Sequence, residues 1–182
     1  MGLFGKKKAS CCCGSAIQPV ERQKVVRVEY LYLDLETCDR CIGADQVLEE
    51  VLGELTPALR LAGYEVEYRK IEVATAELAK KHRFLSSPTI RVNGRDICAE
   101  TQENACACCS EISGTAVDCR VFSYEGGTYE VPPKAMLAEA VLRGVGERPL
   151  PVIGPYRLPE NLKNFFDGKE RQSCCCGGSG CC

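Results

Sequence analysis

Hydrophobic and polar positions follow two different periods along the first third of the chain. Residues 25–33, VVRVEYLYL, are β-branched and aromatic and become apolar on both faces, which predicts a central strand. From Asp39 the period is helical, and one apolar stripe predicts a helix that ends at Gly63. The members of the stripe are Ile42, Val47, Leu48, Val51, Leu52 and Leu55. Pro57 interrupts this segment, so we expect a kink or a second helical segment there.

The alternation of strand and helix patterns continues toward the middle of the chain. Residues 64–73 alternate as a second strand, and Thr75 is placed to cap a short helix. Residues 89–92 predict a third strand, which turns at Asn93-Gly94, a strong hairpin signal. These elements together predict strands that share one sheet with helices packed on it.

A hairpin and a helix complete the pattern. Residues 117–124 and 128–131 predict two strands joined across Gly126-Gly127. Pro132-Pro133 then opens a last helix over residues 134–142. The whole order is β-α-β-α-β-β-α with one extra hairpin, so we expect an α/β fold with one mixed sheet flanked by helices.

The two ends of the chain differ in composition from the middle. Ser-Cys-Cys-Cys-Gly occurs at 10–14 and again at 173–177, in low-complexity segments rich in glycine and serine. Four prolines between residues 149 and 159 mark the start of the second such segment. We therefore expect three parts: a flexible Cys- and Lys-rich tail at 1–21, a folded domain at 22–146 with a cysteine-rich insertion at about 98–116, and a flexible Cys-rich tail at 147–182.

Cysteine is the unusual residue of this composition. Fifteen cysteines in 182 residues is a fraction at which a short secreted chain would be taken for a disulfide scaffold. The count is odd, no apolar leader segment follows Met1–Lys8, and adjacent cysteines are poorly placed to join distant strands. We therefore expect a cytoplasmic thiol or soft-metal protein. More than half of the cysteines are tail thiols: Cys11, Cys12, Cys13, Cys174, Cys175, Cys176, Cys181 and Cys182.

Charge and hydropathy exclude several classes of partner. The net charge is −2, and because Lys6–Lys8 lie in the N-terminal tail, the body of the chain is more acidic than that. An acidic body repels phosphate, so we expect no nucleic-acid partner. No apolar run approaches the roughly 18–20 residues of a membrane span. The chain has neither a C-a-a-X ending nor the myristoylation pattern, so a membrane partner is not expected.

The clearest chemical motif is Cys38-Asp39-Arg40-Cys41, at the junction between the first predicted strand and helix. A sulfur at a helix N-terminus is stabilised as a thiolate by free backbone N–H groups and by the helix dipole. Cys41 lies one helical turn later and is placed to form a disulfide with Cys38. Arg40 would favour the thiolate and Asp39 would oppose it. The same spacing also serves as half of a structural Zn²⁺ site, so both alternatives stand.

A second group of cysteines lies in the expected insertion and at the strand that follows it. Four cysteines from a loop and a strand fit a tetrahedral zinc site, a disulfide that pins the loop, a second redox pair, or a three-thiolate site for a softer metal or metalloid. They also fit a set of unlinked thiols. The members are Cys106, Cys108, Cys109 and Cys119.

The segment Ser86-Ser87-Pro88-Thr89-Ile90 precedes the third predicted strand, and with the C-x-x-C it makes residues 24–142 resemble the thioredoxin-like superfamily. That resemblance implies a cis-proline beside the redox cysteines, with Cys38 as nucleophile, Cys41 as resolving thiol and Ser87-Pro88 as the corner that docks a substrate chain. The chain departs from thioredoxin in having Thr37 before the first cysteine and Asp39-Arg40 between the two. The stretch TCDRC…SSPTIRVNGRDI…CACC…VDCRVFSYEGGTYEVPP is more similar still to an uncharacterised prokaryotic thioredoxin-like family, a domain of unknown function.

Two functions follow from these residues as hypotheses. The first, which is ranked ahead of the second, is a thiol-disulfide oxidoreductase or redox-active dithiol protein with metal or metalloid handling as a purpose; it needs no cofactor, and its partners are protein thiols and disulfides. The second is a protein that binds or delivers Cu, As, Hg or Zn without catalytic turnover, with the tail cysteines as clustered soft ligands. The cofactor in that case is zinc or a soft metal ion.

Overall fold

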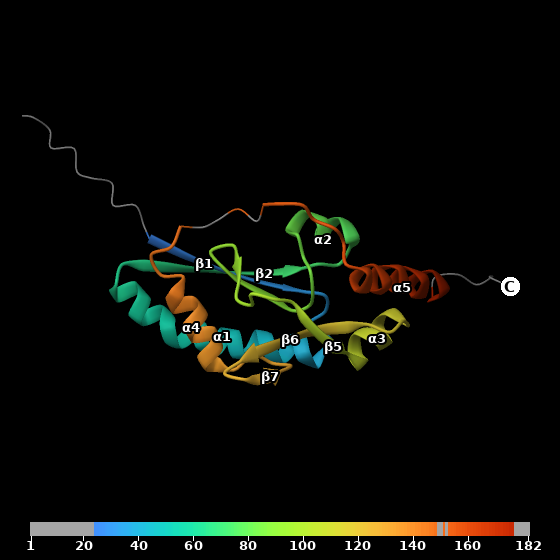
Figure 1. Ribbon diagram of the computed structural model, residues 1–182, viewed down its shortest axis with the longest axis horizontal. Helices are drawn as coiled ribbons and strands as arrows, with labels where there is room; N and C mark the ends of the chain where they lie inside the picture. Colours follow the sequence, from blue (N-terminus) through green and yellow to red (C-terminus); the bar gives the residue numbers. More distant parts are fainter. Residues whose placement is uncertain (1–23, 149–150, 152, 177–182) are drawn as a thin grey trace, which may run out of the picture.

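The computed structural model describes residues 24–148, 151 and 153–176, and for residues 174–176 it describes the backbone alone (Figure 1). Of the predicted tail thiols, Cys11, Cys12, Cys13, Cys181 and Cys182 lie outside the described residues. Cys174, Cys175 and Cys176 form the last residues of a helix, and their side chains lie outside the described part.

A mixed four-stranded sheet forms the centre of the fold, in the order β2-β1-β3-β4. Strand β1 (Lys24–Tyr32) pairs in parallel with β2 (Tyr64–Glu72) and antiparallel with β3 (Thr89–Val92), which pairs with the short β4 (Arg95–Asp96). The β3–β4 turn is at Asn93 and Gly94, as predicted, and both residues have positive φ (51° and 81°).

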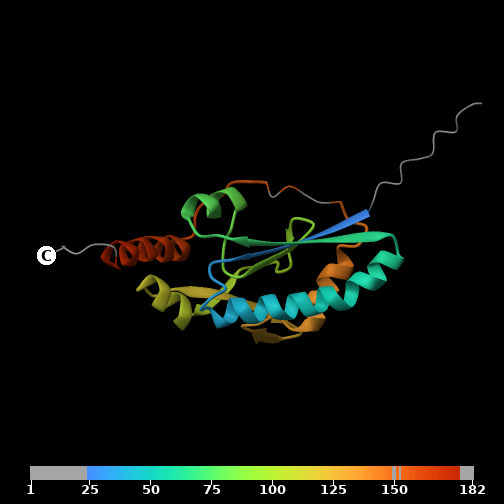
Figure 2. The same ribbon diagram turned by 180° about the vertical axis from the view of Figure 1, so that it is seen from behind.

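Helices cover both faces of this sheet, as Figures 1 and 2 show from opposite sides. The long helix α1 (Asp39–Leu61) packs with α4 (Lys134–Arg143) on one face, and α2 (Ala76–His82) lies on the other. The side chain of Thr75 caps α2 by accepting from the Leu78 N–H. The expected mixed α/β fold with a sheet flanked by helices is thereby confirmed. Among the described helices, even the 23-residue α1 lacks the long apolar stretch that crossing a membrane would require.

Helix α1 differs from its prediction at Pro57. The sequence predicted a kink or a new segment there; no new segment begins, because α1 runs as one helix from Asp39 to Leu61 with the proline inside it. The Thr56 hydroxyl donates to the Leu52 carbonyl at 2.6 Å in the turn just before the proline. Gly63 follows the helix with φ of 79°, which agrees with the predicted end.

The predicted hairpin belongs to a second sheet of three strands, in the order β5-β6-β7. Strand β6 (Asp118–Tyr124) joins β7 (Gly127–Tyr129) through a two-residue turn at Glu125 and Gly126, whose φ values are 47° and 79°. The turn therefore lies one residue before the predicted Gly126-Gly127, because Gly127 pairs with Tyr124.

The cysteine-rich insertion is ordered rather than a loop. It contains β5 (Gln102–Ala105), which pairs with β6, and the short helix α3 (Ala107–Ser113). All four residues of β5 are exposed. A short polar segment of this kind has no hydrophobic period of its own, so its strand conformation depends on the β6 edge with which it pairs.

The largest correction concerns the C-terminal segment, which was expected to be a flexible tail from residue 147. Residues Glu160–Cys176 form helix α5, which packs on α3 and α2 at one end of the molecule (Figures 1 and 2). The Asn161 side chain accepts from the Asp118 N–H at 3.0 Å and donates to the Asp118 carbonyl at 2.6 Å. Leu162, Phe165 and Phe166 are buried, so the i, i+3, i+4 spacing that predicts an amphipathic helix was present in the sequence.

Candidate functional site

Cys38 lies at the junction of β1 and α1, where a tight loop positions it. The Asp34 carboxylate accepts from the backbone N–H groups of Thr37 at 2.6 Å and of Cys38 at 3.1 Å. The Cys38 carbonyl accepts the first hydrogen bond of α1, from the Ile42 N–H at 2.9 Å. Cys38 is therefore the N-cap residue of α1, as the position of the C-x-x-C predicted. Its side chain is buried, which was not predicted.

Cys106 occupies the equivalent position on α3. It is the N-cap residue of that helix, and its N–H donates to the Val117 carbonyl at 2.9 Å. Cys109 lies three residues later and is buried in the same helix. Cys106-Ala-Cys-Cys109 is therefore a second C-x-x-C at a helix N-terminus. The sequence predicted this stretch only as part of a four-cysteine group, although the C-x-x-C spacing was present in it.

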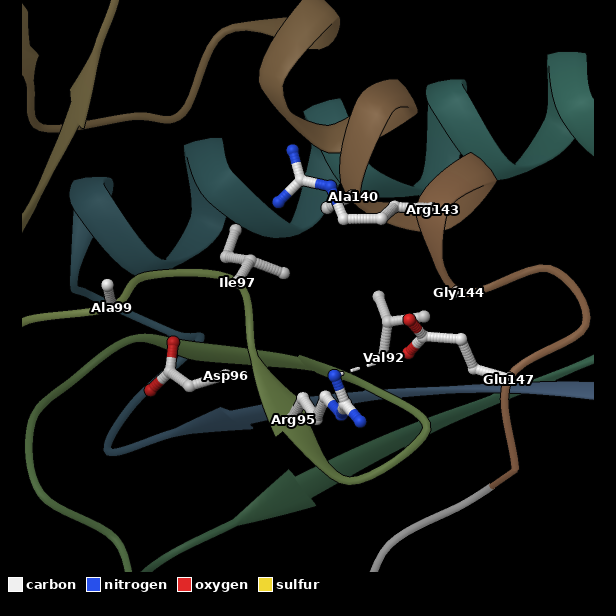
Figure 3. Close-up of a pocket in the computed structure, with 9 residues that line it drawn as sticks. All are labelled: Val92, Arg95, Asp96, Ile97, Ala99, Ala140, Arg143, Gly144 and Glu147. Atoms are coloured by element: carbon white, nitrogen blue, oxygen red, sulfur yellow. Dashed lines mark ion pairs between the residues drawn. The ribbon is translucent and has the colours of Figure 1, made fainter.

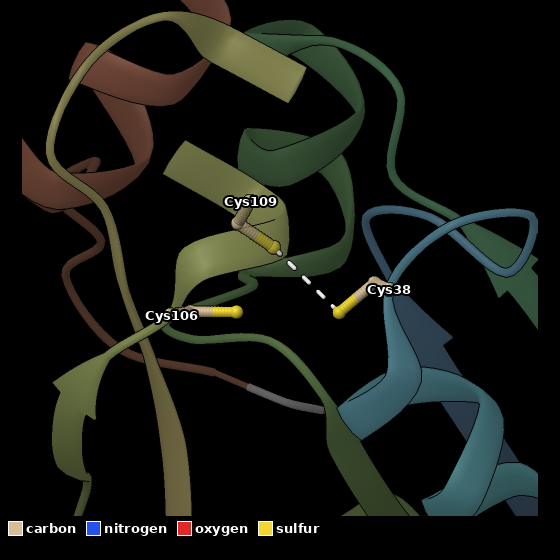
Figure 4. A group of neighbouring side chains, drawn as sticks. All are labelled: Cys38, Cys106 and Cys109. Carbon is tan, nitrogen blue, oxygen red and sulfur yellow. Dashed lines mark hydrogen bonds between the residues drawn. The ribbon is translucent and has the colours of Figure 1, made fainter. Parts of the chain in front are cut away.

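The two C-x-x-C segments meet through their sulfur atoms. The Sγ atoms of Cys38, Cys106 and Cys109 all lie within 4.8 Å of one another, and we call these residues the three-thiol site (Figure 4). The Cys109 thiol donates to the Cys38 sulfur at 3.8 Å. Cys119 on β6 is adjacent, and its thiol donates to the Cys109 sulfur at 3.3 Å. The structure thus joins Cys38, predicted as part of one pair, to three cysteines predicted as part of another group.

The remaining predicted cysteines are not members of the three-thiol site. The Cys41 sulfur is buried and lies 3.4 Å from the Ser87 hydroxyl, while its carbonyl accepts from the Tyr30 hydroxyl at 2.6 Å. Cys108 is half-buried on α3 and is not a member of the site. Each of the seven cysteines whose side chains are described is a free thiol.

The Ser87-Pro88 corner lies beside Cys41 and is engaged by the chain's own backbone. The peptide bond between Ser87 and Pro88 is cis, as the resemblance implied, and it directly precedes β3. The Ser87 hydroxyl accepts from the Leu33 N–H, and the Ser87 carbonyl accepts from the Arg120 N–H at 2.7 Å. The backbone group expected to dock a substrate chain is therefore paired with β6 in this conformation, and its docking role stays a prediction.

Arg40, between the two cysteines of the first C-x-x-C, connects α1 to the segments that carry the other thiols. Its buried guanidinium donates to the carbonyls of Cys119 at 2.9 Å and Ala105 at 3.4 Å, and it pairs with the Glu130 carboxylate at 2.7 Å. From the sequence, Arg40 was expected only to act as a charge on the Cys38 thiolate. In the structure, Arg40 holds Ala105, the residue before Cys106, against the first turn of α1. It holds Cys119 there as well.

Replacing Arg40 by methionine is expected to lower the free energy of unfolding by about 1–3 kcal/mol, because the accepting carbonyls lose their donor. We also expect the affinity of the three-thiol site for an ion to fall about 10–100-fold, as for other residues that orient ligands. Urea denaturation and ion titration measure the two effects. Arg69→Met is the matched control, because Arg69 is exposed and, among the described residues, pairs with Glu67 alone. If Arg40→Met and Arg69→Met had the same free energy of unfolding and the same ion affinity, this role for Arg40 would be contradicted.

Hydrogen bonds between the thiols lower the pKa of some cysteines and raise the pKa of others. Hydrogen bonds from Cys106, then Cys109 and Cys119, lower the pKa of the Cys38 thiol. Hydrogen bonds from Cys109 and then Cys119 lower the pKa of Cys106 to about 7. The pKa of Cys41 is raised, because its thiol donates to Cys38 and because it is buried. The cluster therefore favours a thiolate at Cys38, which is the form that binds metals and attacks disulfides.

The site lies within an apolar core cluster at the end of the molecule where α5 packs. Leu31 and Leu33 from β1, Phe84 after α2, and Phe165 and Phe166 from α5 belong to the same cluster of buried residues as the cysteines. Helix α5 therefore helps to separate the sulfur atoms from solvent.

A surface hollow of about 250 Å³ lies elsewhere, between β4 and α4 (Figure 3). Its walls include an ion pair between Arg95 and Glu147 at 3.7 Å and the apolar side chains of Val92 and Ile97. It contains no cysteine, so it is separate from the thiol chemistry.

Comparison with known proteins identifies the family of the chain and nothing more specific. No curated protein and no solved structure matches it significantly. The family described as Domain of unknown function (DUF2703) matches residues 26–141, which include the four cysteines of the cluster but neither α5 nor the tails. Since this match covers more than half of the chain, the protein belongs to the DUF2703 family.

Proposed function

We propose that this protein binds a soft metal or metalloid ion through Cys38, Cys106 and Cys109. The observation that carries the proposal is the convergence of three buried sulfur atoms, within 4.8 Å of one another, from two helix N-termini distant in sequence. Thiolates are the protein ligands preferred by soft ions. The helix N-termini favour the thiolate form that such ions need.

The spacing of the sulfur atoms supports a shared ion. Two thiolates that each lie about 2.3 Å from one ion, at a tetrahedral angle, are about 3.8 Å apart. The Cys38 and Cys109 sulfur atoms are 3.8 Å apart, so an ion between them requires little rearrangement. The tail cysteines offer further soft ligands, and we propose that they capture ions and pass them to the three-thiol site.

A second candidate function is dithiol redox chemistry on a thioredoxin-like fold. It is favoured by the strand order β2-β1-β3-β4, the C-x-x-C at the start of α1 and the cis Ser87-Pro88 peptide before β3. Two observations weigh against a protein substrate: Cys38 and Cys41 are both fully buried, and Arg120 already occupies the Ser87 carbonyl. We therefore rank ion binding above disulfide exchange.

Both functions require reduced thiols, and we propose a reducing compartment such as the cytoplasm. Cytosolic proteins keep their thiols reduced, which supports this assignment.

Ion binding is tested with a full-length variant in which all eight tail cysteines are serine, here called the tail-serine chain. Native mass spectrometry of the reduced tail-serine chain, after separate addition of Zn(II), Cu(I) and arsenite, is expected to show one bound ion for at least one of the three. Cys109→Ser in this background should abolish that binding, whereas Cys108→Ser, its neighbour outside the site, should preserve it. The proposal would be overturned if the tail-serine chain bound none of the three ions. It would also be overturned if Cys109→Ser and Cys108→Ser bound the ion equally well.

A further inference from the structure

The number of sulfur atoms that can coordinate one ion determines which ions the site can bind. Cys38, Cys106 and Cys109 form a group in which every pair of sulfur atoms lies within 4.8 Å, and Cys119 is not a member of it. The Cys119 thiol instead donates its proton to the Cys109 sulfur at 3.3 Å. The geometry thus distinguishes three sulfur atoms that all lie within 4.8 Å of one another from the Cys119 sulfur, which lies close to Cys109 but is not within that distance of all three.

The charge around the site limits the ion further. The nearby buried guanidinium of Arg40 is already paired with Glu130 and donates to backbone carbonyls. Arg120, next to Cys119 on β6, donates to both oxygens of Asp96. On the α1 side, the Asp34 carboxylate adds a negative charge beside the Cys38 backbone. The guanidinium groups of Arg40 and Arg120 are therefore already engaged by carboxylates of the fold, which reduces what they can contribute to balancing a negatively charged complex.

A buried complex in apolar surroundings is most favourable when its net charge is zero, because removing a charge from water is costly. Three thiolates around a monovalent or divalent ion leave a net negative charge. Three thiolates around a trivalent ion leave none. Phe165, Leu33 and Val117 pack in the same cluster as the cysteines, and their apolar side chains cannot stabilise a net charge. The net charge of the complex therefore affects how strongly each ion binds.

We infer that the three-thiol site is selective for a soft trivalent metalloid of the arsenite and antimonite class, an inference that rests on the proposed function. Binding exchanges the three hydroxyl groups of the neutral trivalent acid for the thiols of Cys38, Cys106 and Cys109. Three metalloid–oxygen bonds break, three metalloid–sulfur bonds form, and the three thiol protons leave with the hydroxyl groups as three waters. No electron is transferred, and the complex stays neutral. Cys119 remains a thiol that donates to the Cys109 sulfur.

The experiment uses the reduced tail-serine chain with arsenite as the probe. X-ray absorption at the arsenic edge is expected to give three sulfur neighbours, and native mass spectrometry one arsenic atom in place of three hydrogen atoms. Cys38→Ser, Cys106→Ser and Cys109→Ser should each lower the arsenite affinity by about 100-fold or more. Residues that orient a ligand without binding the ion themselves typically cost about 10–100-fold. In Cys119→Ser the serine hydroxyl still donates to the Cys109 sulfur, and the sulfur that is removed is not a ligand. This variant should therefore change the arsenite affinity less than about threefold, which is below the effect of a lost orienting residue.

Zinc provides the alternative outcome. If the purified chain holds Zn(II) with four sulfur neighbours, and Cys119→Ser weakens that ion as strongly as Cys109→Ser does, the metalloid inference is wrong while the proposed ion-binding function stands. Arsenite bound by two sulfur atoms and an oxygen would also overturn the inference. If no soft ion binds to the tail-serine chain, the proposed function itself fails.

Discussion

Cys38→Ser is expected to lower the affinity of the reduced chain for its soft ion by about 100-fold or more, whereas Cys41→Ser changes it less than about threefold. The reason is the position of each sulfur atom. Cys38 shares a buried triangle with Cys106 and Cys109, whereas Cys41 lies beside the Ser87 hydroxyl and outside that triangle. A competition titration against a chelator of known affinity, carried out in the tail-serine chain, measures both values.

The same pair of variants separates ion binding from dithiol redox chemistry. In a C-x-x-C reductase the first thiol attacks and the second resolves the mixed disulfide, so both variants would lose turnover. We expect any disulfide-reductase activity of the chain to be weak, because both sulfur atoms are buried. A rapid reductase activity that disappears in Cys38→Ser and Cys41→Ser alike, together with unchanged ion affinity, would reverse the ranking of the two functions.

Phe165→Ala is expected to lower the free energy of unfolding by about 3–5 kcal/mol, the usual cost of deleting a fully buried phenylalanine. The Phe165 side chain is 0% exposed and packs edge-on against Phe166 in the core cluster that contains the thiols. Urea denaturation of the reduced chain measures the change. Leu61→Ala is the control, because Leu61 is 92% exposed at the end of α1 and should change stability by less than about 0.5 kcal/mol.

This prediction also tests whether α5 is part of the folded domain. If residues 160–176 were a flexible tail, Phe165→Ala would leave both stability and thiol accessibility unchanged. Because α5 covers the cluster, the variant should also increase the rate at which an alkylating reagent modifies Cys109. An unchanged rate together with unchanged stability would show that α5 does not pack on α3 in solution.

Local signals in the sequence predicted most of the fold and one half of the site. The β-branched and aromatic run at residues 25–33 placed a central strand, the stripe from Ile42 to Leu55 placed a helix, and Asn93-Gly94 placed a turn. Each of these features depends on neighbours within a few residues, where backbone period and turn stereochemistry act directly. The same local reasoning placed Cys38 at the start of α1.

Contacts between distant segments could not be predicted in this way. Strand β5 has no apolar period of its own and exists because it pairs with β6. In α5 the apolar spacing of Leu162, Phe165 and Phe166 was available, but the prolines and glycines around it favoured a flexible tail. Burial against α3 supplies the stabilisation that the composition of this segment does not indicate.

The fifteen cysteines illustrate this division. Their spacing and positions were enough to indicate thiol chemistry at helix N-termini, because a helix dipole and a C-x-x-C are local properties. Which sulfur atoms act together was decided by packing. Arg40 joins α1 to β6 and to the start of α3, and so Cys38 meets Cys106 and Cys109 while Cys41, one turn away, points to Ser87. A ligand set is a property of distances through space, and those distances exist only when surfaces far apart in the chain are buried against one another.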